Sequence, residues 1–218
     1  MDRYVIIKKT IKTKFDEFMD HGRILYFGAP CGFGKTTVAF ELLRGKKFEL
    51  ISGLETDGIL PEIKLNCDIV MIDDLQQFQE NEDLQKLNEL IRDNPQKKFV
   101  LLSRGSVPGV LRAFQYTGDI NEWLDKDMYE IYEEKEKKYA SDERMLFKYN
   151  IKLTDSEINE ILKESIGHPL GIVVTLQCMN RADSQRAFDS DIVKEAYHEV
   201  FLYFEAAIYH RFDLPIRR

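Results

Sequence analysis

The chain has 218 residues, of which 44% are hydrophobic and 32% are charged, so a packed core is expected and a largely disordered protein is excluded. This length admits one large domain, or one domain with a smaller attachment. The formal net charge of -7 argues against binding of nucleic acid by this chain alone, because a phosphate backbone is bound by a surplus of lysine and arginine.

The chain has three cysteines, Cys31, Cys67 and Cys178, and they form no Cys-x-x-Cys pair. An odd number of cysteines fits a reducing compartment better than a disulfide framework. Nothing at the N-terminus resembles a signal peptide, and no apolar run is long enough to cross a bilayer. We therefore expect a cytoplasmic protein that does not associate with a membrane.

The first half of the chain alternates apolar runs with amphipathic segments. These patterns predict strands at 24–27, 48–52, 69–72 and 99–102, and helices at 35–44 and 82–94. Gly45 and Pro95 mark the ends of the two helices. Strands that alternate with helices at these distances indicate an α/β parallel sheet with right-handed crossovers.

The composition changes after about residue 115. Residues 121–144 are dense in Glu, Lys and Tyr and have no strand-like apolar run, so an exposed helix or a mobile cover is expected there. We expect the division into domains to follow this change, with residues 1–118 as the α/β domain and residues 119–218 as a small helical bundle.

The helical part contains three predicted helices. A Thr-x-x-Glu capping box at Thr154 and Glu157 begins the first one, and Gly167 can end it. Pro169 suits the first turn of the next helix. The last amphipathic helix begins near Asp191.

The stretch GAPCGFGKTT, residues 28–37, joins a predicted strand to a predicted helix and carries the pattern of a phosphate-binding loop, with Ala29 in place of the leading glycine. Gly32 and Gly34 let backbone N–H groups turn inward, where the helix start adds its partial positive charge. Lys35 would reach the β- and γ-phosphates. The expected nucleotide-binding residues of the loop are Pro30, Cys31, Gly32, Phe33, Gly34, Lys35, Thr36 and Thr37. The alternative is a glycine-rich turn with a coincidental Lys-Thr pair.

The stretch IVMIDDL ends an apolar strand with Asp73 and Asp74. Because the carboxyl ends of parallel strands bind ligands, Asp73 is expected to reach a Mg²⁺ ion that the Thr36 hydroxyl also binds. Asp74 is placed to orient or deprotonate a water. Many hydrolytic relatives use a glutamate there, and since an aspartate reaches less far, slow hydrolysis is expected. Taken alone, two aspartates at a strand end are also explained by solvation.

Three further residues admit two interpretations each. Arg104 follows the strand VLLS and can sense a γ-phosphate, or it can be a surface arginine. Pro169 in GHP can press against a base, although a helix end followed by a helix start explains the motif without a ligand. Cys31 can be a redox-sensitive gate, but a small residue that fills a tight turn is the simpler account.

Four motifs, APCGFGKTT, IDDLQQF, LLSRGSVPGVLRAF and GHPLGI, occur in this order. Together they resemble the signal-transducing STAND branch of the AAA+-related P-loop ATPases. Within this branch they are most similar to the large ATP-binding transcriptional regulators of the LuxR type, the group that includes the activator of the maltose regulon. The resemblance runs over nearly the whole chain, from VIIKKTIKTKF to FEAAIYHRFDLPIRR. It implies a parallel-sheet P-loop NTPase core of the AAA+-like (ASCE) type, followed by a small helical lid bundle.

The resemblance also implies roles for individual residues. Lys35 and Thr36 match the Walker A pair, and Asp73 and Asp74 match the double acid of the Walker B strand. Arg104 matches the family's arginine that reads the γ-phosphate. Pro169 matches the proline of the Gly-x-Pro motif, which contacts adenine from the helical lid. The implied ligands are ATP or ADP with Mg²⁺, and the implied catalytic residues are Lys35, Asp73, Asp74 and Arg104.

Members of this family are switches, in which ADP holds a closed monomer while ATP and an inducer release an oligomerising form. The chain departs from relatives at Lys8 and Lys9, where they usually carry an arginine. Relatives also continue into a winged-helix domain, a sensor and a DNA-binding or effector domain, whereas this chain stops where the winged helix would begin. We therefore expect a piece of a longer regulator, with nucleic-acid recognition outside this chain.

Three functions remain open from the sequence. The first is a regulatory module that binds ATP or ADP, hydrolyses ATP slowly and controls self-association of a transcriptional regulator. The alternative is a phosphotransferase (kinase), in which residues 121–144 cover a substrate and Asp74 activates the acceptor hydroxyl. The third is a non-catalytic module that holds nucleotide as a structural ligand.

Overall fold

The structure is a computed structural model that describes residues 9–56, 58–63, 66–78, 81–124, 154–164, 168–181, 194 and 196–202. Contacts divide the chain into two compact units. The first combines Met1–Pro30 with Gly34–Ile131, and the second combines Cys31–Phe33 with Tyr132–Arg218. The first unit contains a sheet, and the second contains helices α7 (Asp155–Glu164) and α8 (Pro169–Arg181).

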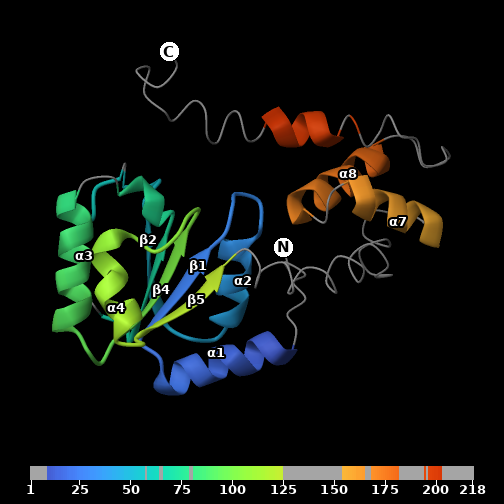
Figure 1. The fold of residues 1–218 in the computed structure, drawn as a ribbon. Helices are drawn as coiled ribbons and strands as arrows, with labels where there is room; N and C mark the ends of the chain where they lie inside the picture. Colours follow the sequence, from blue (N-terminus) through green and yellow to red (C-terminus); the bar gives the residue numbers. More distant parts are fainter. Residues whose placement is uncertain are drawn as a thin grey trace, which may run out of the picture. The chain divides into compact units, whose positions relative to one another are not determined.

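The sheet of the first unit has five parallel strands (Figure 1). They are β1 (Ile24–Gly28), β2 (Phe48–Ser52), β3 (Ile69–Asp73), β4 (Lys98–Ser103) and β5 (Ile120–Leu124), in the spatial order β2-β3-β4-β1-β5. The four strands predicted from apolar runs are confirmed as β1 to β4. The predicted α/β class with a parallel sheet is confirmed as well.

In the described part of this unit, helices lie between most of the successive strands, although none separates β2 from β3. They are α1 (Lys9–His21), α2 (Lys35–Leu42), α3 (Asn81–Asp93) and α4 (Arg112–Tyr116), with the short 3-10 turns η1 (Leu75–Gln77) and η2 (Gly109–Leu111). The two predicted helices are confirmed as α2 and α3, with ends that differ by one or two residues. The sequence analysis did not predict α1, although Phe15 and Phe18 lie three residues apart and are each 2% exposed, which is the spacing of one buried helix face.

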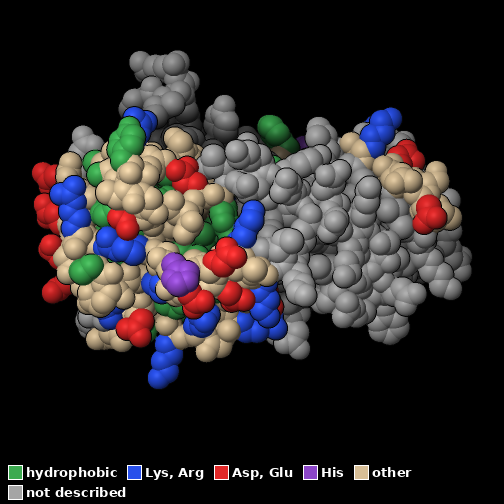
Figure 2. All heavy atoms as spheres, turned by 60° about the horizontal axis from the view of Figure 1, so that its bottom comes forward, with side chains coloured by type: hydrophobic (Ala, Val, Ile, Leu, Met, Phe, Trp, Pro, Cys, Tyr) green, Lys and Arg blue, Asp and Glu red, His purple; other side chains and the backbone are tan. Residues whose placement is uncertain are grey.

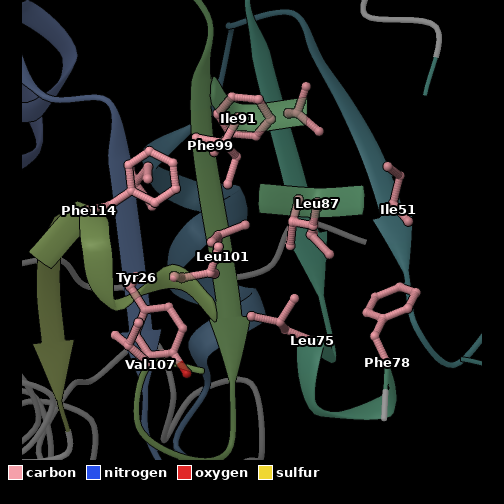
Figure 3. Close-up of a cluster of buried hydrophobic side chains, with 14 residues drawn as sticks. Tyr26, Ile51, Leu75, Phe78, Leu87, Ile91, Phe99, Leu101, Val107 and Phe114 are labelled. Carbon is pink, nitrogen blue, oxygen red and sulfur yellow. The ribbon is translucent and has the colours of Figure 1, made fainter. Parts of the chain in front are cut away.

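Helices cover both faces of the sheet, and successive residues of each strand point to opposite faces. On one side, Ile24 and Tyr26 of β1 join a buried cluster that includes Leu87 of α3 and Phe114 of α4 (Figure 3). The intervening β1 residues are fully buried on the other side, where α2 lies (Figure 1). Burial on both faces explains why β1 is a continuous apolar run.

The prediction of no strand after residue 121 is wrong for residues 121–124, which belong to β5. β5 lies at the edge of the sheet and pairs with β1, and its Trp123 ring contacts the Phe27 ring edge-on, with centroids 4.9 Å apart. Asn121 of β5 is exposed and Glu122 is partly exposed, so two adjacent polar residues interrupt the apolar pattern of this strand. Residues 125–144 lie outside the described part of the chain. The domain division at residue 118 stays a prediction.

The second unit confirms two of the helix starts. The backbone N–H of Thr154 donates to Glu157 Oε2 (2.6 Å), and the N–H of Glu157 donates to Thr154 Oγ1 (3.4 Å), so the predicted capping box forms at the start of α7. Pro169 is the first residue of α8, as predicted. Residues 196–202 are helical, in agreement with the last predicted helix, whose predicted start lies outside the described residues, as does Gly167.

Charges of both signs are interspersed on the described surface that Figure 2 shows. Acidic side chains gather along its left edge, the side on which α3 lies in Figure 1. Glu82, Glu89 and Asp93 of α3 are exposed to solvent. Among the described residues, no helix is both long and apolar enough to span a membrane.

Candidate functional site

The loop between β1 and α2 turns through two glycines in the left-handed region, Gly32 at φ +82 and Gly34 at φ +72. Other residues are strained there, which accounts for glycine at both positions. Gly34 caps α2, and the N–H of Val38 donates to the Gly34 carbonyl oxygen at 2.9 Å. The first N–H groups of a helix have no partner within the helix and carry partial positive charge, so they form a site for an anion.

Lys35, the first residue of α2, folds back along this loop. Its Nζ donates to the carbonyl oxygens of Ala29 (2.7 Å) and Pro30 (3.0 Å). The ammonium group therefore lies beside the loop backbone, and its contact with phosphate stays a prediction.

Thr36 and Asp73 lie 37 residues apart but form a direct contact, in which the Thr36 hydroxyl donates to Asp73 Oδ2 at 2.7 Å. Asp73 Oδ1 accepts the backbone N–H of Asp74 at 2.8 Å. Burial raises the pKa of Asp73; the hydrogen bond from Thr36 lowers it, and the negative charge of Asp74 raises it, each with a smaller effect than burial. A cation next to this carboxylate would relieve the cost of its burial.

The donor set at this point fits a magnesium ion. A hydroxyl and a carboxylate oxygen are hard donors, which Mg²⁺ prefers. Among the described residues, no group of three or more His, Cys, Asp or Glu side chains could hold a metal by itself. A protein that contributes only one or two ligands suits Mg²⁺ that arrives with phosphate oxygens and keeps several waters.

Asp74 and Arg104 form the second pair of this site. The guanidinium Nη2 of Arg104 lies 3.8 Å from Asp74 Oδ1, and both side chains are about one quarter exposed or less, at 24% and 21%. Asp74 has φ +52 and is the one non-glycine residue with positive φ in the described chain. Such strain is often found where the surrounding structure fixes a functional side chain.

The strand order explains how these residues come together. β4 lies between β3 and β1, and all three run parallel, so their carboxyl ends meet at one edge of the sheet. Gly28 of β1 is opposite Ser103 of β4, and the N–H of Ala29 donates to the Ser103 carbonyl at 3.3 Å. Arg104 therefore follows the strand between the phosphate-loop strand and the strand with the two aspartates.

The structure thus brings five of the predicted site residues together within the first unit: Lys35, Thr36, Asp73, Asp74 and Arg104. Thr37 is half-buried in the first turn of α2. The predicted binding residues Cys31, Gly32, Phe33 and Pro169 fall in the second unit. Sequence reasoning missed Gln76, whose amide bonds to Asp74 and to the backbone of Arg104.

Sequence reasoning also missed His168, which contacts Cys31 and Phe33 within the second unit. His168 Nδ1 accepts the backbone N–H of Gly171 (3.3 Å), so Nε2 carries the proton that is shared with the Cys31 carbonyl oxygen (3.2 Å). Burial lowers the pKa of His168, and the bond to Cys31 raises it by less. The motif GHP gives no signal for this contact, because its Gly and Pro already suit a helix end and a helix start.

No model of a known protein family matches the sequence, and no curated protein sequence matches it. Solved structures do match. The Walker-type ATPase paby2304 of Pyrococcus abyssi is 16% identical with a TM-score of 0.60, and the match covers 94% of this chain and 76% of the ATPase. RuvB of Thermotoga maritima is 20% identical with a TM-score of 0.51, and covers 88% of this chain and 69% of RuvB.

A STAND protein with a tetratricopeptide repeat sensor from Pyrococcus horikoshii is 17% identical, with 90% of this chain and 33% of that protein covered. Its TM-score of 0.46 is too low to establish a shared fold. The parallel sheet and the two matches with higher TM-scores agree with one another. The chain therefore has the α/β fold of the P-loop ATPases.

Proposed function

We propose that this chain is a nucleotide-dependent switch module that binds ATP or ADP with Mg²⁺ and hydrolyses ATP slowly. One observation carries the proposal: the Thr36–Asp73 contact at 2.7 Å and the Arg104–Asp74 contact at 3.8 Å lie at the edge of the sheet where the phosphate loop begins. A hydroxyl, two carboxylates and an arginine at the carboxyl ends of parallel strands form a suitable site for a nucleoside triphosphate.

The proposed roles follow from these positions. Lys35 binds the β- and γ-phosphates, Thr36 and Asp73 hold Mg²⁺, and Asp74 orients the attacking water. Arg104 senses the γ-phosphate. The other proposed nucleotide contacts are Pro30, Cys31, Gly32, Phe33, Gly34 and Thr37 in the loop, and Pro169 for the adenine.

Slow hydrolysis is supported by the surroundings of Asp74. Its Oδ1 accepts a hydrogen bond from Gln76 Nε2 (2.8 Å) and also faces the Arg104 guanidinium. Both contacts occupy the carboxylate oxygen that would otherwise face an attacking water, and an aspartate reaches less far than a glutamate would. Slow hydrolysis suits a switch, whose nucleotide state must last, better than it suits a fast motor.

The wider role rests on the order of the sequence motifs. We propose that the α/β domain and the helical lid belong to a longer LuxR-type transcriptional regulator with sensor and effector domains, and that the ATP state self-associates. In this proposal the lid comprises residues 119–218, and nucleic acid is recognised outside this chain.

The first experiment is to denature the purified protein, identify any released nucleotide and measure its amount against protein. ADP that is stoichiometric with the chain and survives gel filtration would support a switch. A protein that is purified without nucleotide, turns ATP over quickly and gives an acceptor-dependent burst of ADP would instead favour the phosphotransferase.

Two variants test the proposed site directly. Lys35→Ala should abolish ATP binding measured by calorimetry, whereas Lys46→Ala, at an exposed lysine just after α2, should not change it. Asp74→Asn should retain bound ATP and favour oligomers in gel filtration, since asparagine tolerates the left-handed conformation at this position. Unchanged ATP hydrolysis in Asp74→Asn would exclude a catalytic role for this carboxylate.

A further inference from the structure

Gln76 uses both ends of its side-chain amide between two residues of the proposed site. Its Nε2 donates to Asp74 Oδ1 at 2.8 Å, and its Oε1 accepts the backbone N–H of Arg104 at 3.1 Å. The partners fix the orientation of the amide, because a flipped group would place Nε2 against an N–H donor and Oε1 against a carboxylate. Gln76 therefore connects the end of β3 to the end of β4.

The turn that carries Gln76 is held in place by its neighbours. η1 begins after Asp74, and the backbone N–H of Gln77 donates to the Asp74 carbonyl oxygen at 2.9 Å. Leu75 is 1% exposed and Phe78 is 2% exposed, and both belong to the buried cluster under α3 (Figure 3). With its backbone anchored in the core, Gln76 has little freedom to follow a moving partner.

The backbone around Arg104 is held from its other side by Tyr26. The hydroxyl of Tyr26 lies 2.8 Å from the carbonyl oxygens of both Gly105 and Ser106, and can donate to them. Tyr26 is fully buried, and burial raises its pKa to about 12, so the hydroxyl remains a donor at neutral pH. Gln76 on one side and Tyr26 on the other thus fix the peptide groups around Arg104.

We propose that Gln76 is a positioning residue that couples Asp74 to Arg104. This inference rests on the proposed function, in which Arg104 senses the γ-phosphate and Asp74 orients water. When Arg104 turns from Asp74 to a γ-phosphate, Gln76 keeps its bond to the carboxylate and sets the distance between the two groups. Gln76 therefore affects the rate of hydrolysis and the ratio of the affinities for ATP and ADP. The affinity for the part of the nucleotide that ATP and ADP share depends on the loop between β1 and α2.

The test compares Gln76→Ala with Gln77→Ala, a matched change in the same turn that leaves the bridge intact. For each variant we would measure kcat and KM for ATP, and the ratio of the affinities for a non-hydrolysable ATP analogue and for ADP by calorimetry. Gln76→Ala should lower kcat and the affinity ratio by about tenfold or more, in line with the loss of a hydrogen bond to a charged group, while ADP affinity stays within about twofold.

A second variant separates positioning from folding. Gln76→Glu retains an acceptor for the Arg104 N–H but places a carboxylate against Asp74, so its effect should equal or exceed that of Gln76→Ala. Melting temperatures would show that both variants are folded. In the double variant Gln76→Ala with Arg104→Ala, the affinity ratio should fall no further than in Arg104→Ala alone, because the two residues act as one unit.

The outcomes separate the inference from the proposed function. A normal kcat and affinity ratio in both Gln76 variants, with a lowered ratio in Arg104→Ala, would overturn the positioning role and leave the switch intact. Normal nucleotide binding in Lys35→Ala and a normal ratio in Arg104→Ala would instead overturn the proposed function. Additive losses in the double variant would also overturn the coupling.

Discussion

Removal of the Thr36 hydroxyl by Thr36→Val should weaken nucleotide binding only when Mg²⁺ is present. Valine keeps the shape of the side chain, so the loss is confined to the oxygen that lies 2.7 Å from Asp73 Oδ2. A polar contact with a charged group contributes about 1.5–3 kcal/mol, which corresponds to a roughly 10- to 150-fold loss of Mg²⁺-dependent ATP affinity. With EDTA the affinity should change by no more than about twofold.

The same variant should move the pH dependence of Mg²⁺ binding. Because burial raises the pKa of Asp73, protons compete with the cation at a higher pH than they would at an exposed aspartate. The Thr36 hydrogen bond opposes this rise, so its removal raises the pKa of Asp73 further. The pH at which half of the Mg²⁺-dependent affinity is lost should therefore be higher in Thr36→Val than in the unchanged protein.

The assay is calorimetric titration of ATP with Mg²⁺ and with EDTA, across a pH series. Thr117→Val is the matched control, because the Thr117 hydroxyl also donates to an aspartate, Asp119 Oδ2, at 2.7 Å, but on an exposed turn. Equal losses of affinity with and without Mg²⁺, or no loss at all, would show that Thr36 and Asp73 do not hold the cation.

Three further predictions concern stability, each checked by thermal unfolding. Leu101→Ala, at a fully buried position in β4, should destabilise the first unit by about 2–5 kcal/mol. A melting temperature equal to that of the unchanged protein would contradict the burial of Leu101 in the core. Tyr26→Phe should cost about 1 kcal/mol because the Gly105 and Ser106 carbonyls lose their donor; a stability gain would contradict it. The pKa of His168 is lowered in the folded protein, so folding favours the neutral imidazole. The free energy of unfolding of the second unit should therefore decrease as the pH is lowered below about 6.5. His168→Asn should make this free energy less dependent on pH.

The parts of the fold that the sequence predicted are those in which the pattern is local. β1, β3 and β4 are buried on both faces, so each is a continuous apolar run that can be recognised without knowledge of its neighbours. The phosphate loop was predicted for a similar reason, since its glycines and Lys35 are fixed by the conformation of one short segment. Local patterns therefore predicted the core of the sheet and the centre of the candidate site.

The parts that were missed depend on contacts between distant residues. β5 contains Asn121 and Glu122, and it is a strand because it pairs with β1 and packs Trp123 against Phe27. The role of Gln76 requires that β3 and β4 are neighbours and that Asp74 has φ +52. No spacing rule gives either fact, because an aspartate–aspartate–leucine sequence is compatible with many turns. The pairing of β5 with β1 and the contact between the ends of β3 and β4 both follow from strand order, which is a property of the whole sheet.

The contacts of the candidate site suggest how it could distinguish nucleotides. Thr36 is bonded to Asp73, Arg104 faces Asp74, and the Lys35 ammonium is bonded to loop carbonyl oxygens. A bound nucleotide would replace these partners, and the net gain from such an exchange is small compared with the strength of either contact. Affinity then depends on small differences between the two sets of partners, and a γ-phosphate that draws Arg104 from Asp74 alters the balance. In our proposal Gln76 remains bonded to Asp74 in that exchange. A movement of Arg104 would then alter the position of Asp74, the residue proposed to orient water.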